Sequence, residues 1–509
     1  MNQNSLIINY LEKSSAKNQK INSGAIAYLA MLDHINSVSP EIAKSILKEL
    51  SDQKNNLKMI ASENFSSLAV QLAMGNLFTD KYAEGFPYHR FYAGCDNVDE
   101  IEDMAVQAAC QLFNSENAYV QPHSGADANL IAFWSILNQK VQDPFLSKMD
   151  KKDVSQLSEN EWAELRKSFG EQKLLGMNYY SGGHLTHGYR HNVSSRMFNV
   201  ESYDVDKKTM LIDYDVIRDK AKKFQPLILL AGYSAYPRKI NFKIFREIAD
   251  EIGAVLMVDM AHFSGLVAGK AFSGDFNPVP FADIITSTTH KTLRGPRGGM
   301  ILSTSEFSDQ VNKGCPMVIG GPLPQIMLSK ALAFQEAQSE EFQIYTKNVI
   351  KNASSLAQNC IKEGLDVLTG GTDNHLLLIN VSKFNLTGRQ AESAIRSAKI
   401  TLNRNSLPFD KNGPWYTSGL RLGTPAITSL GMGTQEMKTI AETLKIVLAN
   451  TTPETISKGS KAGELSKARF NLNQDSLNQS KSNVTKLLEQ FPLYPELDIN
   501  YIEDYFLSS

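Results

Sequence analysis

Cysteine is scarce in this sequence of 509 residues. The four cysteines lie far apart and form no CxxC pair. This pattern excludes a disulfide framework and a structural zinc site of the usual spacing, and it is typical of a reducing compartment. We therefore expect a cytoplasmic protein.

Long apolar runs and a strong net charge are also missing. The sequence has no run of about 18 apolar residues, the length that crosses a membrane, and its N-terminus lacks the pattern of a signal peptide. The 52 Lys and Arg against 54 Asp and Glu leave a formal charge of −2, whereas a nucleic-acid-binding protein needs a concentrated basic surface. We expect no membrane partner and no nucleic-acid partner.

Two common nucleotide signatures are absent as well. No GxxxxGK[ST] and no GxGxxG follows a predicted strand, which excludes ATP and NAD sites of ordinary form. The composition, with 42% hydrophobic and 21% charged residues, is typical of a globular protein. The length predicts two or three domains, and the protein is either an enzyme or an assembly protein.

Between about residues 115 and 305, short apolar runs recur along the chain. Continuous runs of this kind are typical of strands buried on both faces of a mostly parallel sheet, and a helical segment at 242–252 has the place of a crossover. The sequence thus predicts an α/β fold, in which ligands bind beyond the carboxyl ends of the strands. The runs are Ala118–Val120, Leu174–Met177, Leu227–Ala231, Ala254–Val258, Ala282–Thr286 and Met300–Leu302.

Three stretches do not fit this rhythm. Residues 1–38 are polar, residues 138–173 are strongly charged and partly helical, and residues 455–482 are polar and poor in aromatics. The last of them reads as a surface or mobile insertion. Ser39-Pro40-Glu41 predicts the start of a helix, with an N-cap, a proline at the first helical position and an acid in the first turn.

Lys291 follows the predicted strand at 282–286 after a run of hydroxyl residues and His290. Desolvation at the end of a buried strand lowers the pKa of a lysine and makes its amine nucleophilic. The functional interpretation is a lysine that bonds to a carbonyl, and the alternative is a surface lysine after a strand.

Three other strand ends supply complementary groups. Asp259 ends one strand and suits a pyridinium nitrogen, which a carboxylate keeps protonated, although it could also cap a turn. Ser234 brings a hydroxyl to the same edge, and Ser124-Gly125 opens a helix whose backbone N–H groups suit a phosphate. Together with Lys291, these groups predict a pyridoxal-phosphate pocket.

A glycine-rich segment, Gly182–His191, contains three histidines. A metal site is conceivable, but no acid or cysteine lies at the usual ligand spacing and the glycines indicate a loop. We expect no metal, and predict instead that His184 stacks on the cofactor ring.

These motifs resemble serine hydroxymethyltransferase, a pyridoxal-phosphate enzyme of the aspartate-aminotransferase fold, fold type I. The resemblance runs in the family's order from about residue 40 to 450. The matching stretches are Met59–Asn64, Lys81–Gly85, Gln121–Gly125, Gly182–Gly188, Ser234–Tyr236, Val258–His262, Thr288–Thr292, Gly295–Gly299, Gly320–Leu323, Asn403–Ser406 and Thr417–Ala426.

The resemblance implies reversible transfer of the hydroxymethyl group of serine to tetrahydrofolate, giving glycine and 5,10-methylenetetrahydrofolate. It also implies a homodimer or a dimer of dimers with shared active sites. Each site residue then has an implied role. The cofactor would be held by Lys291 covalently, Asp259 at the ring nitrogen, His184 by stacking, Ser234 and His262 near the phenolic oxygen, Ser124 and Gly125 at the phosphate, and Tyr82, Gly320 and Gly321 from the second subunit.

The substrates have implied partners too. Arg421 would bind the amino-acid carboxylate through a bidentate fork, with the structural ion pair as its alternative. Glu84 is the candidate for proton transfer. The remaining residues are Ser62, Tyr82 and Tyr92 at the substrate, Gly183, Leu185 and Asn405 at the folate, and Thr288, Thr289 and His290 around the lysine.

The chain departs from the family's pattern at Ala126, Phe91, Ala93, Tyr179 and Tyr180. Ala126 removes one possible hydroxyl donor to the phosphate. An aldolase or racemase activity on small amino acids is expected as a side reaction, and a non-catalytic assembly protein that retains the fold is the alternative. The motifs predict an N-terminal arm at 1–75, a large domain at 76–335 and a small domain at 336–509.

Overall fold

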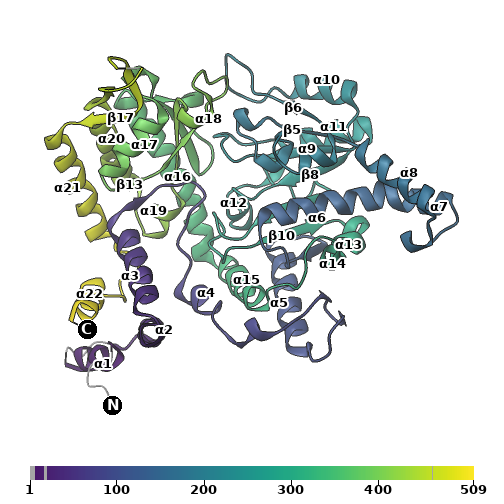
Figure 1. The fold of residues 1–509 in the computed structure, drawn as a ribbon, viewed down its shortest axis with the longest axis horizontal. Helices are drawn as coiled ribbons and strands as arrows, with labels where there is room; N and C mark the ends of the chain where they lie inside the picture. Colours follow the sequence, from purple (N-terminus) through teal and green to yellow (C-terminus); the bar gives the residue numbers. More distant parts are fainter. Residues whose placement is uncertain (1–5, 17–19, 461, 509) are drawn as a thin grey trace.

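The computed structural model describes residues 6–16, 20–460 and 462–508. Residues 1–5 and 17–19 of the predicted arm and residue 461 of the polar insertion lie outside the described residues. The described residues form a seven-stranded sheet, a four-stranded sheet and three two-stranded pairs. A small helical layer and a helical projection complete the molecule (Figure 1).

The larger sheet has the strand order β4-β10-β9-β8-β7-β5-β6. Strand β10 is antiparallel to both of its neighbours, and the other neighbouring pairs are parallel. All six apolar runs form strands, which confirms the α/β prediction. The strands are β4 (Asn117–Tyr119), β5 (Lys173–Met177), β6 (Asn199–Tyr203), β7 (Ile228–Gly232), β8 (Val255–Asp259), β9 (Ile284–Thr288) and β10 (Gly299–Ser303).

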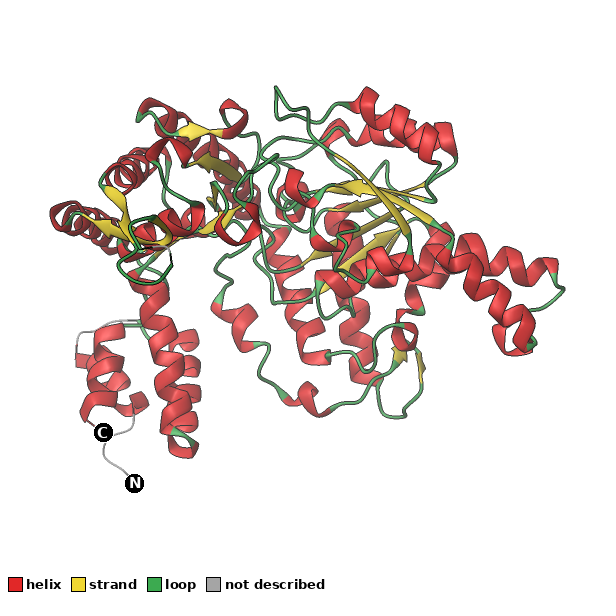
Figure 2. Ribbon diagram, turned by 45° about the horizontal axis from the view of Figure 1, so that its top comes forward, coloured by secondary structure: helices red, strands yellow, loops and turns green. Residues whose placement is uncertain are grey.

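Helices cover both faces of this sheet (Figure 2). Alternate residues of β7 enter different cores, Leu229 on one face and Leu230 on the other, which explains why the central strands are apolar throughout. One core is covered by α5 (Asp96–Phe113), α10 (Tyr214–Phe224), α11 (Phe242–Ile252), α12 (Ser264–Ala268) and α15 (Pro324–Ala337). The other is covered by α6 (Gly125–Leu137), α8 (Glu159–Gly170) and α13 (Ser305–Asn312).

The smaller sheet is antiparallel, in the order β11-β12-β15-β14. It shares a core with helices that precede, interrupt and follow its strands in the chain. Its strands are β11 (Asp366–Val367), β12 (Leu376–Asn380), β14 (Asn403–Asn405) and β15 (Gly419–Gly423), and its helices are α16 (Glu340–Lys362), α17 (Gly388–Ser397) and α20 (Thr434–Ala449). The predicted domain boundaries stay a prediction.

The polar stretch at 455–482 is built into this second unit. Strand β17 (Leu465–Leu472) pairs with β16 (Thr451–Thr455), and α21 (Gln474–Gln490) follows. Phe470 and Leu472 pack against the second core, while alternate residues of β17 are exposed. Among the described residues of 455–482 only Ser480 is buried, so the stretch lies at the surface as expected, although β17 and α21 tie it to the second unit.

The two ends of the described chain meet in a helical layer (Figure 1). It contains α1 (Leu6–Ala16), α2 (Ser23–Val38), α3 (Pro40–Asn55) and α22 (Ile499–Ser508). The hydroxyl of Tyr501 donates to the carbonyl of Leu6 at 2.7 Å. Ser39 caps α3 as predicted. After α3, β1 (Leu57–Lys58) pairs with β13 (Ile400–Thr401) and leads toward Ser62.

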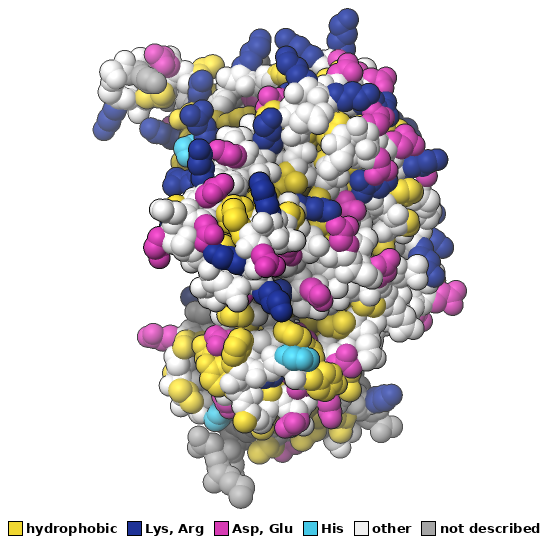
Figure 3. Space-filling model, turned by 90° about the vertical axis from the view of Figure 1, so that its right-hand side faces the viewer, with side chains coloured by type: hydrophobic (Ala, Val, Ile, Leu, Met, Phe, Trp, Pro, Cys, Tyr) yellow, Lys and Arg dark blue, Asp and Glu magenta, His cyan; other side chains and the backbone are white. Residues whose placement is uncertain are grey.

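The charged stretch at 138–173 forms a helical projection with α7 (Asp143–Lys148) and α8, at the right of Figure 1. Leu165 and Phe169 anchor it to the large sheet's core. Viewed from this side, the molecule carries interspersed positive and negative side chains (Figure 3). None of the described helices is long and apolar enough to span a membrane. The remaining short elements are α4 (Leu68–Leu72), β2 (Gly85–Phe86), β3 (His89–Arg90), α9 (Ser194–Met197), α14 (Gly314–Met317), α18 (Gly413–Tyr416) and α19 (Pro425–Ser429).

Candidate active site

A cavity of about 570 Å³ lies beyond the carboxyl ends of β7, β8 and β9 and is closed by residues of β14 and β15 from the smaller sheet. Fourteen of the residues predicted from sequence line it. They are Ser62, Ser124, Gly125, Gly183, His184, Leu185, Ser234, Asp259, His262, Thr288, His290, Lys291, Asn405 and Arg421. Segments far apart in the sequence thus converge on one space.

Asp259 is the fixed anion of this cavity. Its Oδ2 accepts hydrogen bonds from His187 Nε2 at 3.0 Å and from Asn129 Nδ2 at 2.9 Å, and its Oδ1 accepts from the N–H of Ala261 at 3.0 Å. Burial would raise the pKa of Asp259, but the hydrogen bonds from His187 and Asn129 and the nearby imidazoles hold it well below its usual range. The carboxylate therefore stays charged.

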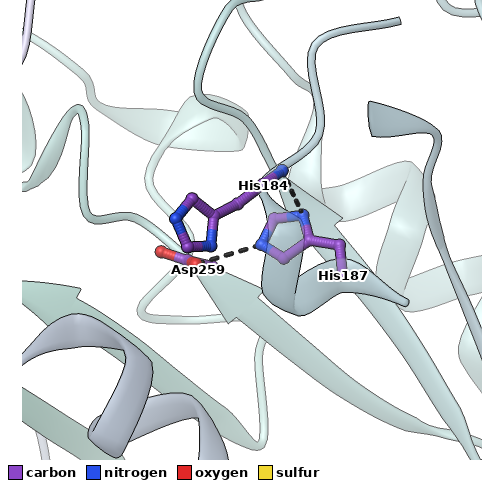
Figure 4. A group of neighbouring side chains, drawn as sticks. All are labelled: His184, His187 and Asp259. Atoms are coloured by element: carbon purple, nitrogen blue, oxygen red, sulfur yellow. Dashed lines mark hydrogen bonds and ion pairs between the residues drawn. The ribbon is translucent and has the colours of Figure 1, made fainter. Parts of the chain in front are cut away.

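His187 has a defined tautomer (Figure 4). The N–H of His184 donates to His187 Nδ1 at 3.3 Å, so the ring proton resides on Nε2 and points to Asp259. His184, His187 and Asp259 bring three possible metal-ligand atoms within 4.8 Å of one another. The two imidazoles are already engaged, since His184 Nδ1 lies 2.8 Å from the hydroxyl of Thr186. These hydrogen bonds favour an orienting network.

Lys291 follows β9, is half-buried and lines the cavity. Burial lowers its pKa to about 8, with the charges of Arg421 and Arg297 acting in the same direction and Asp259 opposing them. The side-chain amide of Asn64 donates to the carbonyl of Lys291 at 2.9 Å and fixes the backbone there. A substantial fraction of the amine is neutral near pH 8, the form that attacks a carbonyl.

The residues before Lys291 have different roles. The hydroxyl of Thr288 donates to the carbonyl of Ala261 at 3.2 Å, and Thr288 and His290 both line the cavity. Burial lowers the pKa of His290 to about 3, so this imidazole is neutral. Thr289 is buried and does not line the cavity: its hydroxyl donates to the carbonyl of Pro296 at 2.6 Å. Thr289 supports the following turn.

Arg421, on β15, projects into the cavity from the smaller sheet. It donates to the carbonyl of Ser234 at 2.8 Å and to Oδ1 of Asn403 at 3.2 Å. Within the described ranges no Asp or Glu forms an ion pair with it, and burial lowers its pKa to about 10. A guanidinium held by neutral groups in a cavity is a site for an anion, which disfavours the structural ion pair.

The sequence analysis did not predict two buried side chains at this site. His375 Nε2, from the start of the smaller sheet, lies 3.2 Å from His262 Nδ1, and the two rings stack. Asn129, on α6, links Asp259 to the hydroxyls of Thr186 and Thr286. A histidine before a strand and an amide inside a helix carry no local signal of a site.

The turn that opens α6 fits a phosphate. Ser124 caps the helix by accepting from the N–H of Asp127 at 3.1 Å. At Gly125 a Cβ atom would lie 2.7 Å from Cγ2 of Thr288, so the backbone at this turn lies against β9. At Gly183 a Cβ would lie 2.1 Å from the carbonyl oxygen of Met177. Glycine at both positions permits these close approaches, and both residues line the cavity.

Five predicted residues lie outside this cavity and near one another. The ring of Tyr82 meets that of Tyr92 at 5.0 Å, and the hydroxyl of Tyr92 donates to Glu84 Oε2 at 3.4 Å. Gly321 adjoins the ring of Tyr82 and Gly320 adjoins Glu84. Tyr82 and Tyr92 are 59% and 46% exposed. The two tyrosine rings therefore lie at the surface of the described chain.

The fold, a nucleophilic lysine after one strand, a carboxylate at the end of the next and a helix start that suits a phosphate define a pyridoxal-phosphate enzyme of fold type I. A family model of serine hydroxymethyltransferase matches residues 35–170 and 168–444. The chain therefore belongs to the serine hydroxymethyltransferase family.

Full-length relatives agree with this assignment. The chain is 57% identical over 503 residues to the serine hydroxymethyltransferase of Treponema pallidum, covering 99% of this chain and 87% of that protein. It is 52% identical over 478 residues to that of Salinispora tropica, covering 94% and 99%. It is 50% identical over 496 residues to that of Chlamydia muridarum, covering 97% and 99%. The predicted family, fold class, cofactor, co-substrate and reaction are confirmed.

Proposed function

We propose that this cavity performs the reversible transfer of the hydroxymethyl group of serine to tetrahydrofolate, giving glycine and 5,10-methylenetetrahydrofolate. The observation that carries the proposal is the convergence of Lys291, Asp259 and Arg421 in one cavity. Bound pyridoxal phosphate supplies an electron sink for the bonds around Cα of the amino acid. A non-catalytic protein has no use for these three groups together.

Asp259 and His187 would hold the ring nitrogen of the cofactor. A charged carboxylate beside the ring nitrogen favours the protonated ring, and the hydrogen bond from His187 holds that carboxylate in one orientation. His184 lies beside this pair (Figure 4) and is neutral, because burial lowers its pKa to about 4. A neutral imidazole suits stacking, since it adds no positive charge over the ring.

Arg421 and Ser62 recognise the amino acid. The guanidinium presents two parallel donors to a carboxylate, and its contacts with Ser234 and Asn403 set its direction. Lys291, whose amine is partly neutral, would hold the cofactor at its aldehyde. Thr288 and His290 shape the space around that amine, and Ser124 and Gly125 hold the phosphate. Gly183, Leu185 and Asn405, which line the same cavity, would hold the folate.

Glu84 exchanges a proton with the substrate hydroxymethyl group in the cavity of the neighbouring subunit. Support comes from its place outside its own cavity, beside the exposed rings of Tyr82 and Tyr92. Gly320 and Gly321, next to it, complete the phosphate site of the same neighbour. The active unit is then a homodimer, alone or within a dimer of dimers. We also propose a cytoplasmic location, in keeping with four free cysteines.

Purified protein supplied with pyridoxal phosphate, serine and tetrahydrofolate should form glycine only when the folate is present. Because Arg421 offers a planar fork that lysine lacks, Arg421→Lys should raise KM for serine by about ten-fold or more, equivalent to roughly 1.4 kcal/mol. Steady-state kinetics measure both results. Arg246→Lys is the control, because Arg246 forms an ion pair with Asp283 and neither residue lines the cavity. Glycine formation without folate, or an unchanged KM in Arg421→Lys, would contradict the proposal.

Shared sites are tested with mixed dimers. Lys291→Ala and Glu84→Gln homodimers should each be nearly inactive. A mixed dimer, however, pairs the intact Lys291 of one subunit with the intact Glu84 of the other. Random exchange of subunits makes half of the dimers mixed, each with one intact site, so about a quarter of wild-type activity should return. No recovery after verified exchange would place Glu84 in the cavity of its own chain.

A further inference from the structure

Lys330 is a buried charge that the proposed reaction does not use. It lies on α15 and is only 1% exposed. Within the described residues no carboxylate lies in ion-pair contact with it. Burial lowers the pKa of Lys330, while the charges of Glu102 and Asp127 act in the opposite direction. A lysine in such a place requires compensation from polar groups.

The compensation comes from three backbone carbonyls. The ammonium of Lys330 donates to the carbonyls of Val120 at 2.5 Å, Pro122 at 3.0 Å and Gly299 at 2.8 Å. An ammonium has three donors and no acceptor, so each of its hydrogens has a partner. No neutral side chain offers three donors from a single atom.

The three carbonyls lie where β4 separates from β10. The last regular pair between these strands is Tyr119 with Ile301, and the chain then turns toward Ser124. One further bond, from the N–H of Gly299 to the carbonyl of Pro122 at 2.9 Å, holds the two segments together. Lys330 therefore joins the segment before the phosphate turn to the start of β10.

The turn itself depends on this junction. At Gly299 a Cβ atom would lie 2.2 Å from the carbonyl oxygen of Ser124, so the two backbones are in close contact. Ala126 has no hydroxyl to donate, so the phosphate relies on Ser124 and on backbone N–H groups. The direction of those N–H groups follows the path of residues 120–124.

We propose that Lys330 is a positioning residue for the phosphate turn: by holding the carbonyls of Val120, Pro122 and Gly299 together, it sets the place of Ser124 and Gly125 and thereby the affinity for pyridoxal phosphate. This inference rests on the proposed role of Ser124 and Gly125. Lys330 itself does not touch the cofactor, since it does not line the cavity.

Two variants disturb the junction in different ways. Lys330→Met keeps the length of the side chain and removes all three donors. Gly298→Ala keeps the lysine but displaces it, because the new Cβ would lie 2.5 Å from Cε of Lys330. Ser329→Ala is the matched control: Ser329 is the preceding residue on α15, is equally buried, and donates instead to the carbonyl of Val70 at 2.7 Å.

The experiment titrates each apoprotein with pyridoxal phosphate and compares the melting temperatures of the apo and loaded forms. We expect a Kd about ten-fold or more higher in Lys330→Met and Gly298→Ala, and a smaller gain in melting temperature on loading, since ligand stabilisation depends on Kd. Ser329→Ala should lower the melting temperature of both forms equally and leave Kd within two-fold. A raised Kd in the first two variants but not in Ser329→Ala would show that Lys330 affects cofactor affinity and not only the stability of the fold.

Kd values within two-fold of wild type in both Lys330→Met and Gly298→Ala would overturn the inference. If Lys330→Met does not fold, Gly298→Ala decides alone. Gly125→Ala tests the proposed phosphate turn separately from the role of Lys330, since its Cβ would displace the turn directly. A normal Kd in Gly125→Ala contradicts the proposed phosphate turn, whereas a weakened Gly125→Ala beside a normal Gly298→Ala contradicts only the role of Lys330.

Discussion

Replacing Lys291 by alanine should abolish the visible absorption band of the bound cofactor and lower the rate of glycine formation by about 10³-fold or more. In the proposed site Lys291, just after β9, is the amine that bonds to the aldehyde of the cofactor, and alanine leaves no such group. Spectra of the purified variant and a folate-dependent glycine assay measure the two effects.

The matched control is Lys140→Ala, since Lys140 is exposed and paired with Glu306. This variant should keep both the absorption band and the rate.

The pH dependence of cofactor capture tests Lys291 a second way. Because the pKa of Lys291 is lowered to about 8 by burial, capture of pyridoxal phosphate by the apoprotein should accelerate as the pH rises through about 8. The neutral amine is the reactive form. A normal band in Lys291→Ala, or a midpoint near the ordinary lysine value, would show that another amine reacts.

Asp259→Asn should lower kcat by about 10³-fold, in line with the roughly 3–5 kcal/mol that follows removal of one partner of a buried charge pair. Asparagine has the same shape but no charge, so it cannot keep the ring nitrogen protonated. The amide offers one acceptor oxygen instead of two, so the hydrogen bonds that Asp259 accepts from His187 and from the N–H of Ala261 cannot both persist. Steady-state kinetics give the rate, and the absorption spectrum reports the changed protonation of the bound ring.

Asp204→Asn supplies the comparison, since Asp204 accepts from the hydroxyl of Ser181 at 2.8 Å outside the cavity. It should change kcat by less than two-fold. If Asp259→Asn keeps its kcat while still binding pyridoxal phosphate, the carboxylate does not serve the ring nitrogen, and the orienting network around His187 needs another explanation.

The sequence predicted the buried strands well and one edge strand not at all. Strands β7 and β8 are apolar at every position because both faces are covered, and such runs are visible without a structure. Strand β6 reads Asn-Val-Glu-Ser-Tyr, has exposed alternate positions and lies at the edge of the sheet. Its pattern is too short and too polar to stand out.

In the site too, some residues could be predicted from a local pattern and others could not. Lys291 and Asp259 follow apolar strands directly, and parallel strands bring their carboxyl ends to one edge, so a local pattern predicts that they meet. His375 and Asn129 join the site only through contacts across 113 and 130 residues. Lys330 is harder still, because a lysine within a helix is usually exposed and only the packing of α15 against the end of β4 buries it.

The sequence by itself determined the class of fold, the family, the cofactor and most of the groups in the cavity, because these depend on short motifs and on the order of apolar strands. The tertiary structure decided which groups share the cavity. The fold turns Thr289 away from the cavity, leaves Glu84 half-buried outside it, and places Lys330 against the segment that precedes Ser124. Such placements depend on where a side chain's hydrogen-bonding partners lie after folding, and those partners are distant in the sequence.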